Sequence, residues 1–143
     1  MLRELARCYQ AFEAYSSAHI RSLGLTPSQF DIVATLGNTP GMSFRELGEK
    51  TLITKGTLTG VVDRLEAQKL VRRSAAPEDG RSMIVSLTPT GERLFRRAFD
   101  AHLVHLRLAL GGLDAKRLAQ IEAALRGLRE TFAAIDGRKA GAK

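Results

Sequence analysis

The turn PEDGRS at residues 77–82 combines residues that shape the backbone with residues that carry charge. Pro77 and Gly80 favour a tight turn, and Arg81 would then stand near its tip. A guanidinium group in that position is well suited to the narrow, electronegative minor groove of DNA. The alternative is a solvated surface turn in which Asp79 and Arg81 form an ion pair that contributes little to stability.

A second group of residues lies on one side of the helix that the sequence predicts at 55–70. Four apolar residues at positions i, i+3, i+4 and i+7 should face inward, namely Leu58, Val61, Val62 and Leu65. Two glycines make the opposite side small, although each costs about 1 kcal/mol of helix stability relative to Ala. A small face lets the backbone approach base edges, while Thr and Arg donate hydrogen bonds and a Lys contacts phosphate. The alternative is a solvated helix face of mediocre helix propensity. The residues with this potential are Lys55, Gly56, Thr57, Thr59, Gly60 and Arg64.

The elements that must position these residues are mainly helices. Capping boxes at Thr26 and Ser43 predict helices that begin at Pro27 and Phe44. The second of these helices is about two turns long and is separated by a short connector from the helix at 55–70. A short helix, a tight turn and a second helix with one solvent-facing side form a helix-turn-helix, whose second helix enters the major groove.

Short alternating segments at residues 70–74 and 83–87 predict two strands on either side of the charged turn. The segment that follows the helix-turn-helix is therefore a β-hairpin, which makes the lobe a winged helix with the turn as its wing. Amphipathic helices flank this lobe at about residues 2–23, 89–110 and 118–135. The expected fold class is mainly α with a small β-hairpin wing.

Composition limits the class of protein and its partners. The 143 residues suffice for one domain of ordinary size, and 22 Lys and Arg against 15 Asp and Glu give a net charge of +7. This excess favours a polyanionic partner, with nucleic acid ahead of an anionic membrane. No stretch approaches the roughly 20 uncharged apolar residues of a membrane span, and the first residues carry charges where a signal peptide needs an apolar core. We therefore expect a cytoplasmic protein that does not contact a membrane.

Four segments of the sequence resemble the MarR family of bacterial transcriptional regulators. They are LTPSQFDIVATL, MSFRELGEKT, GTLTGVVDRLEAQKLVRR and PEDGRSMIVSLTPTGERLF. The most specific element is Asp79-x-Arg81, followed at family spacing by Val85-x-Leu87-Thr88-x-x-Gly91. The resemblance implies a single domain over 1–143, with a DNA-binding lobe at about 25–91, dimerisation helices at 1–24 and 92–136, and a flexible tail at 137–143.

The resemblance also implies a function, namely a repressor that binds a palindromic operator as a homodimer. In this family an Arg at the position of Arg81 enters or borders the minor groove, and the Asp at position 79 helps to fix the loop. A dimer agrees with the apolar stripes of the terminal helices, which are too long for one small lobe to cover. Twofold symmetry calls for half-sites about one turn, near 34 Å, apart. The residues expected to contact DNA are Ser43, Arg45, Lys55, Gly56, Thr57, Thr59, Gly60, Arg64, Asp79, Arg81 and Ser82.

Family members of this kind release DNA when a small aromatic or phenolic anion settles between the dimer helices and the lobe. The stripe formed by Phe12, Tyr15, Ser16 and His19 combines aromatic walls with polar tips in that region. Equally, these four residues could be ordinary interface residues.

Other site chemistries have weaker support in the sequence. His102 and His105 are three residues apart on one helix and could both reach a metal, but no carboxylate or thiol is near them in sequence. Cys8 resembles the redox cysteine of the peroxide-sensing relatives only in lying near the N-terminus. No phosphate loop, nucleophile motif or paired carboxylates suggest an enzyme, and no cofactor is expected. The rival hypothesis is a winged-helix DNA-coating or protein-interaction module without a small-molecule ligand.

Overall fold

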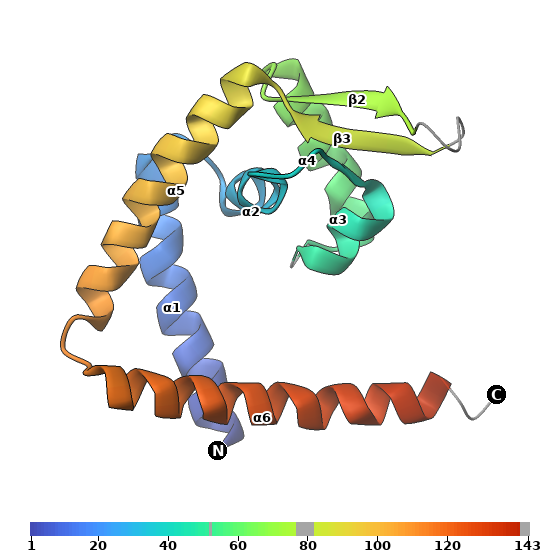
Figure 1. Ribbon diagram of the computed structural model, residues 1–143. Coiled ribbons are helices and arrows are strands. Elements are labelled where there is room, and N and C mark those ends of the chain that lie inside the picture. Colours follow the sequence, from blue (N-terminus) through green and yellow to red (C-terminus); the bar gives the residue numbers. More distant parts are fainter. Residues whose placement is uncertain (52, 77–81, 141–143) are drawn as a thin grey trace. The chain divides into compact units, whose positions relative to one another are not determined.

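The computed structural model describes residues 1–51, 53–76 and 82–140, without the side chains of Lys55 and of residues 135–140. Helices dominate, with one small antiparallel sheet, as the sequence predicted (Figure 1). The chain divides into two units, Met1–Leu106 and Arg107–Lys143. The elements in chain order are α1 (Leu2–Ser22), α2 (Pro27–Leu36), β1 (Met42–Ser43), α3 (Phe44–Lys50), α4 (Lys55–Ala67), β2 (Val71–Ala75), β3 (Met83–Leu87), α5 (Pro89–Leu110) and α6 (Ala115–Ala140).

The helix starts follow local capping chemistry. The backbone N–H of Gln29 donates to the Thr26 hydroxyl at 3.2 Å, and the Gln29 side chain accepts from the Thr26 N–H at 3.0 Å. Ser43 and Glu46 form the second reciprocal pair at the start of α3, at 3.2 and 2.8 Å. Both capping boxes predicted from the sequence are confirmed.

The recognition-type helix α4 ends earlier than its apolar pattern predicted. The pattern extends to residue 70, whereas α4 stops at Ala67. Lys69 adopts the left-handed conformation, with φ of 58°, and the N–H of Leu70 donates back to the carbonyl of Leu65 at 2.9 Å. This hydrogen bond pairs a carbonyl group near the C-terminus of α4 that would otherwise lack a partner. The chain then continues into β2.

The sheet has three strands in the order β1-β3-β2. The predicted hairpin is confirmed, with Val71 opposite Leu87 and Ala75 opposite Met83. Strand β1 was not predicted, because a two-residue strand exists only through its pairing with β3, which is distant in sequence. Gly41 permits this approach, since a Cβ there would lie 2.8 Å from the Val85 carbonyl oxygen and φ is +118°.

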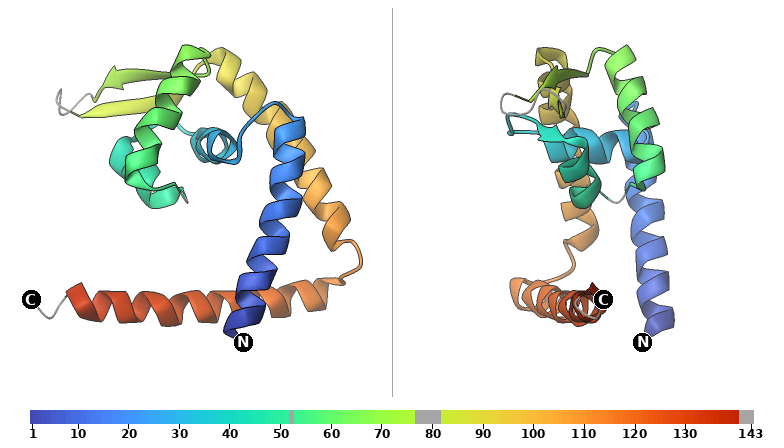
Figure 2. Two further views of the ribbon diagram at one scale, coloured as in Figure 1. Left: turned by 180° about the vertical axis from the view of Figure 1, so that it is seen from behind. Right: turned by 90° about the vertical axis from the view of Figure 1, so that its right-hand side faces the viewer.

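The main core lies within the helix-turn-helix lobe. The inward side of α4 is confirmed, because its four predicted apolar side chains are at most 1% exposed. They pack with residues of α2, α3 and the hairpin in one cluster. In Figure 2 the β2–β3 hairpin extends beside α3 and α4. Because α4 is fixed by its inner side, its outer side has a defined orientation.

A second, smaller cluster joins α1 to the lobe. Ile20, Leu25 and Ala98 are buried together, with Leu23, Phe30 and Leu94 packed around them. Helix α1 contacts α2, and its C-terminal half crosses α5 (Figures 1 and 2), where hydrogen bonds from Tyr15 and between Ser16 and His102 link the two helices.

The second unit is dominated by α6. Its start is capped by the Asp114 carboxylate, which accepts from the Arg117 N–H at 2.7 Å. The helix continues to Ala140, whereas the sequence predicted that a flexible tail begins at residue 137. Arg138, Lys139 and Ala140 are good helix formers, although Gly137 is not. Its apolar residues Leu118, Ile121, Leu125 and Phe132 are exposed. None of the helices in the described part of the chain is long and apolar enough to cross a membrane.

Candidate DNA-binding interface and adjoining cavity

Helices α3 and α4 and the turn between them form the helix-turn-helix. Thr51 is buried at the end of α3, where its hydroxyl donates to the Leu47 carbonyl at 2.7 Å and its N–H donates to the same oxygen at 2.9 Å. Leu47 and Leu58 are both buried in the lobe core. These buried contacts join α3 to α4 in the core, so α4 has a fixed position relative to α3.

The outer side of α4 is open. A Cβ added at Gly56 or Gly60 would meet no atom within 4 Å outside the local backbone. Thr57, Thr59 and Arg64 are exposed on the same helix. Thr54 is the N-cap residue of α4, but its hydroxyl lies 3.0 Å from the Thr57 hydroxyl and does not cap the backbone.

A cluster around Arg73, called the Arg73 cluster below, connects the hairpin to α4. Arg73 in β2 forms ion pairs with Asp63 and Glu66 of α4, the latter at 3.1 Å, and its guanidinium carbon lies 5.3 Å from the centre of the Phe44 ring. Sequence reasoning missed this cluster, since the partners come from three elements. It positions β2, α3 and α4 with respect to one another.

The remaining DNA-contact candidates occupy different environments. Ser43 is half-buried and engaged in capping, and Arg45 is exposed and paired with Glu49 at 3.1 Å. Ser82 closes the described hairpin, because its carbonyl accepts from the Ala76 N–H at 2.8 Å. Asp79 and Arg81 lie outside the described residues.

A cavity of about 590 Å³ adjoins the start of α4. Aromatic and aliphatic side chains from α1, α2 and α5 form most of its wall, and Ile53, Thr54 and Thr57 bring the helix-turn-helix to its edge. Of the four predicted ligand contacts, Phe12 and Ser16 line the cavity. Tyr15 and His19 do not line it. The aromatic lining residues are Tyr9, Phe12, Phe30 and Phe99.

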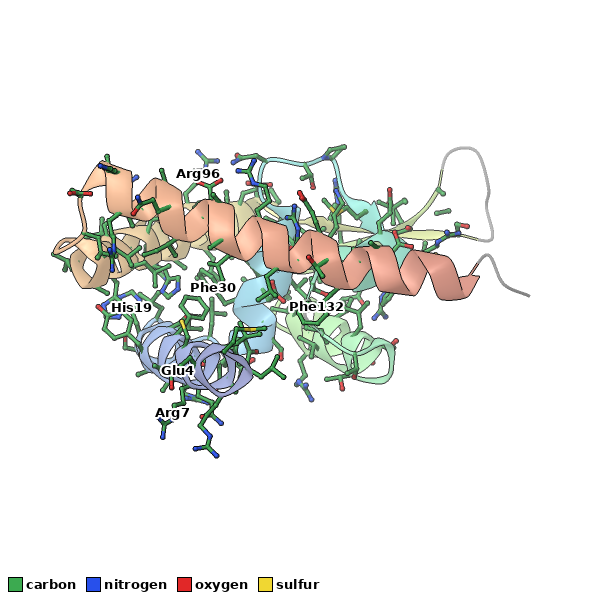
Figure 3. All side chains as sticks on the ribbon, turned by 90° about the horizontal axis from the view of Figure 1, so that it is seen from below. Glu4, Arg7, His19, Phe30, Arg96 and Phe132 are labelled. Carbon is green, nitrogen blue, oxygen red and sulfur yellow. The ribbon has the colours of Figure 1, made fainter. Side chains whose placement is uncertain are left out.

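Tyr15 and His19 instead join a cluster of rings between α1 and α5. The ring of His105 stacks on Tyr15 with centroids 4.1 Å apart and on His19 at 4.0 Å. His19 Nδ1 lies 3.1 Å from His102 Nδ1, and His102 Nε2 lies 3.1 Å from the Ser16 hydroxyl. Figure 3 shows His19 and Phe30 on one side of α1 and Arg7 on the opposite side. The sequence pointed to His102 and His105 but not to their contact with His19, which only the packing of α1 on α5 creates.

Burial and mutual repulsion lower the pKa values of His19 and His102. Burial, followed by the nearby His105, lowers the pKa of His19 below 6.5. Burial also lowers the pKa of His102, and His19 and His105 lower it further. Among the described residues, no group of three His, Cys, Asp or Glu side chains is arranged to hold a metal ion. Cys8 is exposed.

Comparisons with known proteins agree with this architecture. Residues 23–82 match the model of the MarR family. The chain is 30% identical to the transcriptional regulator MhqR of Bacillus subtilis over 71% of this chain and 70% of that protein. It is 32% identical to the transcriptional repressor NicR of Pseudomonas putida over 78% and 70% of the two chains.

The crystal structure of a transcriptional regulator from Pseudomonas aeruginosa superposes with a TM-score of 0.78 at 32% identity, covering 90% of this chain and 96% of that one. BpsR of Bordetella bronchiseptica, whose DNA binding is regulated by 6-hydroxynicotinic acid, superposes with a TM-score of 0.79 at 30% identity, covering 89% and 91%. The chain therefore belongs to the MarR family of DNA-binding transcriptional regulators.

Proposed function

We propose that this protein is a homodimeric repressor that binds a palindromic operator through the outer side of α4. One observation carries the proposal: Gly56 and Gly60 leave open space on a helix whose other side is fixed in the core. Entry of α4 into the major groove would explain why the helix contains two glycines, which otherwise only lower its stability. Thr57, Thr59 and Arg64 would then read base edges, with Lys55 on a phosphate.

The wing is proposed to extend the interface into the minor groove. Arg81 would reach or border that groove, and Asp79 and Ser82 would shape the loop that holds it. Ser43 and Arg45, at the start of α3, would contact the DNA backbone beside α4. The net charge of +7 per chain, or +14 for two chains, supports attraction to a polyanion.

Dimer formation is proposed for residues 1–24 and 92–136, outside a DNA-binding lobe at 25–91. The first half of α1 leaves Leu2, Tyr9 and Phe12 more than half exposed, which is unusual for a stable monomer. In the second unit, the exposed apolar residues of α6 give the same indication. A twofold dimer would place two copies of α4 on half-sites about one helical turn apart.

A small aromatic ligand is proposed to release the DNA from the cavity. The wall has aromatic side chains suited to a flat ring, and Thr57 belongs both to this wall and to the start of α4. A ligand that binds more tightly to the form with displaced α4 shifts the population away from DNA. Support also comes from relatives named for aromatic chemistry, including a homoprotocatechuate degradative operon repressor and BpsR with 6-hydroxynicotinic acid. We place this action in the cytoplasm, where operator DNA lies.

The test is a selection of binding sites from random duplex DNA with the full chain, followed by titration of the selected site. We expect an enriched inverted repeat that is bound at least 1,000-fold (about 4 kcal/mol) more tightly than scrambled DNA of equal length. Weak preference for any sequence, together with no response to aromatic acids, would instead support the DNA-coating module.

A further inference from the structure

Ser16, His102 and His19 form a hydrogen-bonded row from the cavity wall into the contact between α1 and α5. Two contacts of 3.1 Å build the row, one between Ser16 Oγ and His102 Nε2, the other between the Nδ1 atoms of the two histidines. Ser16 and His102 line the cavity and are buried. The row therefore links two histidine rings, which can take up a proton, to the Ser16 hydroxyl at the cavity wall.

The contact between the two Nδ1 atoms determines how many protons the histidine pair holds. Two ring nitrogens 3.1 Å apart share one proton, because one donates and the other accepts. In the neutral pair, the remaining proton sits on only one of the two Nε2 atoms. After uptake of one proton, both Nε2 atoms carry a hydrogen. A further proton would place two N–H groups against each other, so the pair takes up one proton and no more.

This proton changes the direction of the Ser16 hydroxyl. In the protonated pair, His102 Nε2 must donate to Ser16 Oγ, whichever ring holds the shared Nδ1 proton. The hydroxyl hydrogen of Ser16 is then free to donate to another acceptor. In the neutral pair, Ser16 can instead donate to His102.

An anion in the cavity would be stabilised by this change. Among the described residues that line the cavity, the charged side chains are Glu13 and Asp31, and none is Lys or Arg. Bringing a further carboxylate beside these two groups without a counter-charge is unfavourable. Of the described lining residues, His102 is the one that can supply positive charge.

We infer that the cavity binds an aromatic carboxylate together with one proton, which the His19–His102 pair holds while the Ser16 hydroxyl donates to the carboxylate. This inference rests on the proposed ligand response and specifies its chemistry. The ligand ring would pack against Phe12 and Phe30 on the cavity wall. Binding of the proton and binding of the carboxylate are then coupled, so that each increases the affinity for the other.

The surroundings of the pair set the sign of the coupling. Among the described residues, titratable groups around it include His105 of α5, which stacks on His19, and Glu13 of α1 and Asp31 of α2, which line the same cavity as His102. Burial, with the neighbouring histidines, lowers the pKa of both members of the pair, so the empty protein takes up this proton less readily than a free histidine does. A bound carboxylate raises the pKa of the pair, and the acid therefore binds more tightly as the pH falls.

The inference is tested by calorimetric titration of the full chain with benzoate and salicylate, and with benzamide as an uncharged analogue. Titrations in buffers of different ionisation enthalpy report protons taken up. We expect uptake approaching one proton per carboxylate at neutral pH, and a dissociation constant that rises about tenfold per pH unit above the pKa of the empty pair. Benzamide should bind without proton uptake. Carboxylate binding without proton uptake, or no carboxylate binding between about pH 5.5 and 8, would overturn the inference.

Two matched variants locate the proton. His102→Gln keeps groups that can bond to Ser16 and His19 but cannot hold a proton, so proton uptake should disappear. His105→Gln removes a ring outside the row and should retain the uptake. The opposite pattern would overturn the assignment, and the measurement on the unmodified chain remains decisive where His102→Gln does not fold.

The same samples are titrated with the selected DNA in the absence of any acid. Specific DNA binding without proton-coupled carboxylate binding would overturn this inference alone. If the unmodified chain shows no specific DNA binding, the proposed function itself is overturned.

Discussion

Arg73 of β2 forms an ion pair with Asp63 of α4, so the strand that leads into the wing is tied to the helix proposed to read DNA. Glu66 holds the same guanidinium from one turn further along α4, and Phe44 of α3 lies under it. Strand β2 and α4 would therefore approach DNA as one unit. This coupling predicts that changes at Arg73 affect DNA binding even though the side chain is largely covered.

The first prediction is that Arg73→Gln lowers both stability and operator affinity. The free energy of unfolding should fall by about 1 kcal/mol, a modest value because Asp63 and Glu66 are partly exposed and solvent screens the pairs. Operator affinity should fall further than stability alone explains, because β2 and α4 lose the ion pairs that hold them together. Chemical unfolding and DNA titration of Arg73→Gln and Asp63→Asn check this, and unchanged affinity in both variants would show that the cluster is only structural.

The second prediction is that the protein is a dimer at micromolar concentration. The exposed apolar residues of α1 and α6 need a partner surface. Light scattering should return twice the 15.6 kDa of one chain. A mass of 15.6 kDa would remove both the dimer and the palindromic operator.

The third prediction concerns the wing residue Arg81. Arg81→Ala should weaken operator binding and change stability by less than about 0.5 kcal/mol, because the sequence predicts a surface turn here and substitutions in such turns usually have small effects. Loss of one cation from each of two chains should reduce the log-log salt slope by roughly one to two. Titrations at several salt concentrations, on A·T-rich and G·C-rich flanks, would contradict a minor-groove role if affinity, slope and flank preference all stay the same.

The fourth prediction is a loss of stability in mild acid. His19 and His102 have pKa values below their ordinary 6.5 in the folded protein, so below pH 6.5 the unfolded chain binds more protons than the folded one. The free energy of unfolding should therefore decrease as the pH falls from 6.5 toward the folded pKa values. Chemical unfolding at a series of pH values should show a weaker decrease in His102→Gln than in the unmodified protein. Equal slopes would mean that other groups control acid stability.

Local chemistry explains which parts of the fold could be predicted from the sequence. The capping residues Thr26 and Ser43 and the inward positions of α4 depend on neighbours within a few residues, and the structure confirms them. Strand β1, the Arg73 cluster and the contact of His19 with His102 depend on pairing between distant segments. No local pattern encodes such pairing.

The same distinction applies to the cavity. Phe12 and Ser16 were predicted from a stripe on one helix, and both line it. Tyr15 and His19 belong to the same stripe but turn toward α5, where His105 stacks on them. Residues from α2 and from the start of α4 complete the wall, and their approach to α1 follows only from the packed fold.

The central claim is that the outer side of α4 enters the major groove, and a size series at Gly60 tests it most directly. A Cβ at this position would meet no atom within 4 Å outside the local backbone, so Gly60→Ala and Gly60→Leu should be at least as stable as the unmodified protein, by up to about 1 kcal/mol. The measurement is the affinity of both variants for the selected operator, beside their thermal unfolding. The account predicts a modest loss of affinity for Gly60→Ala and complete loss of specific binding for Gly60→Leu, because the added volume keeps the helix away from the base edges. A stable Gly60→Leu dimer that still binds the operator with unchanged affinity and sequence preference would contradict it.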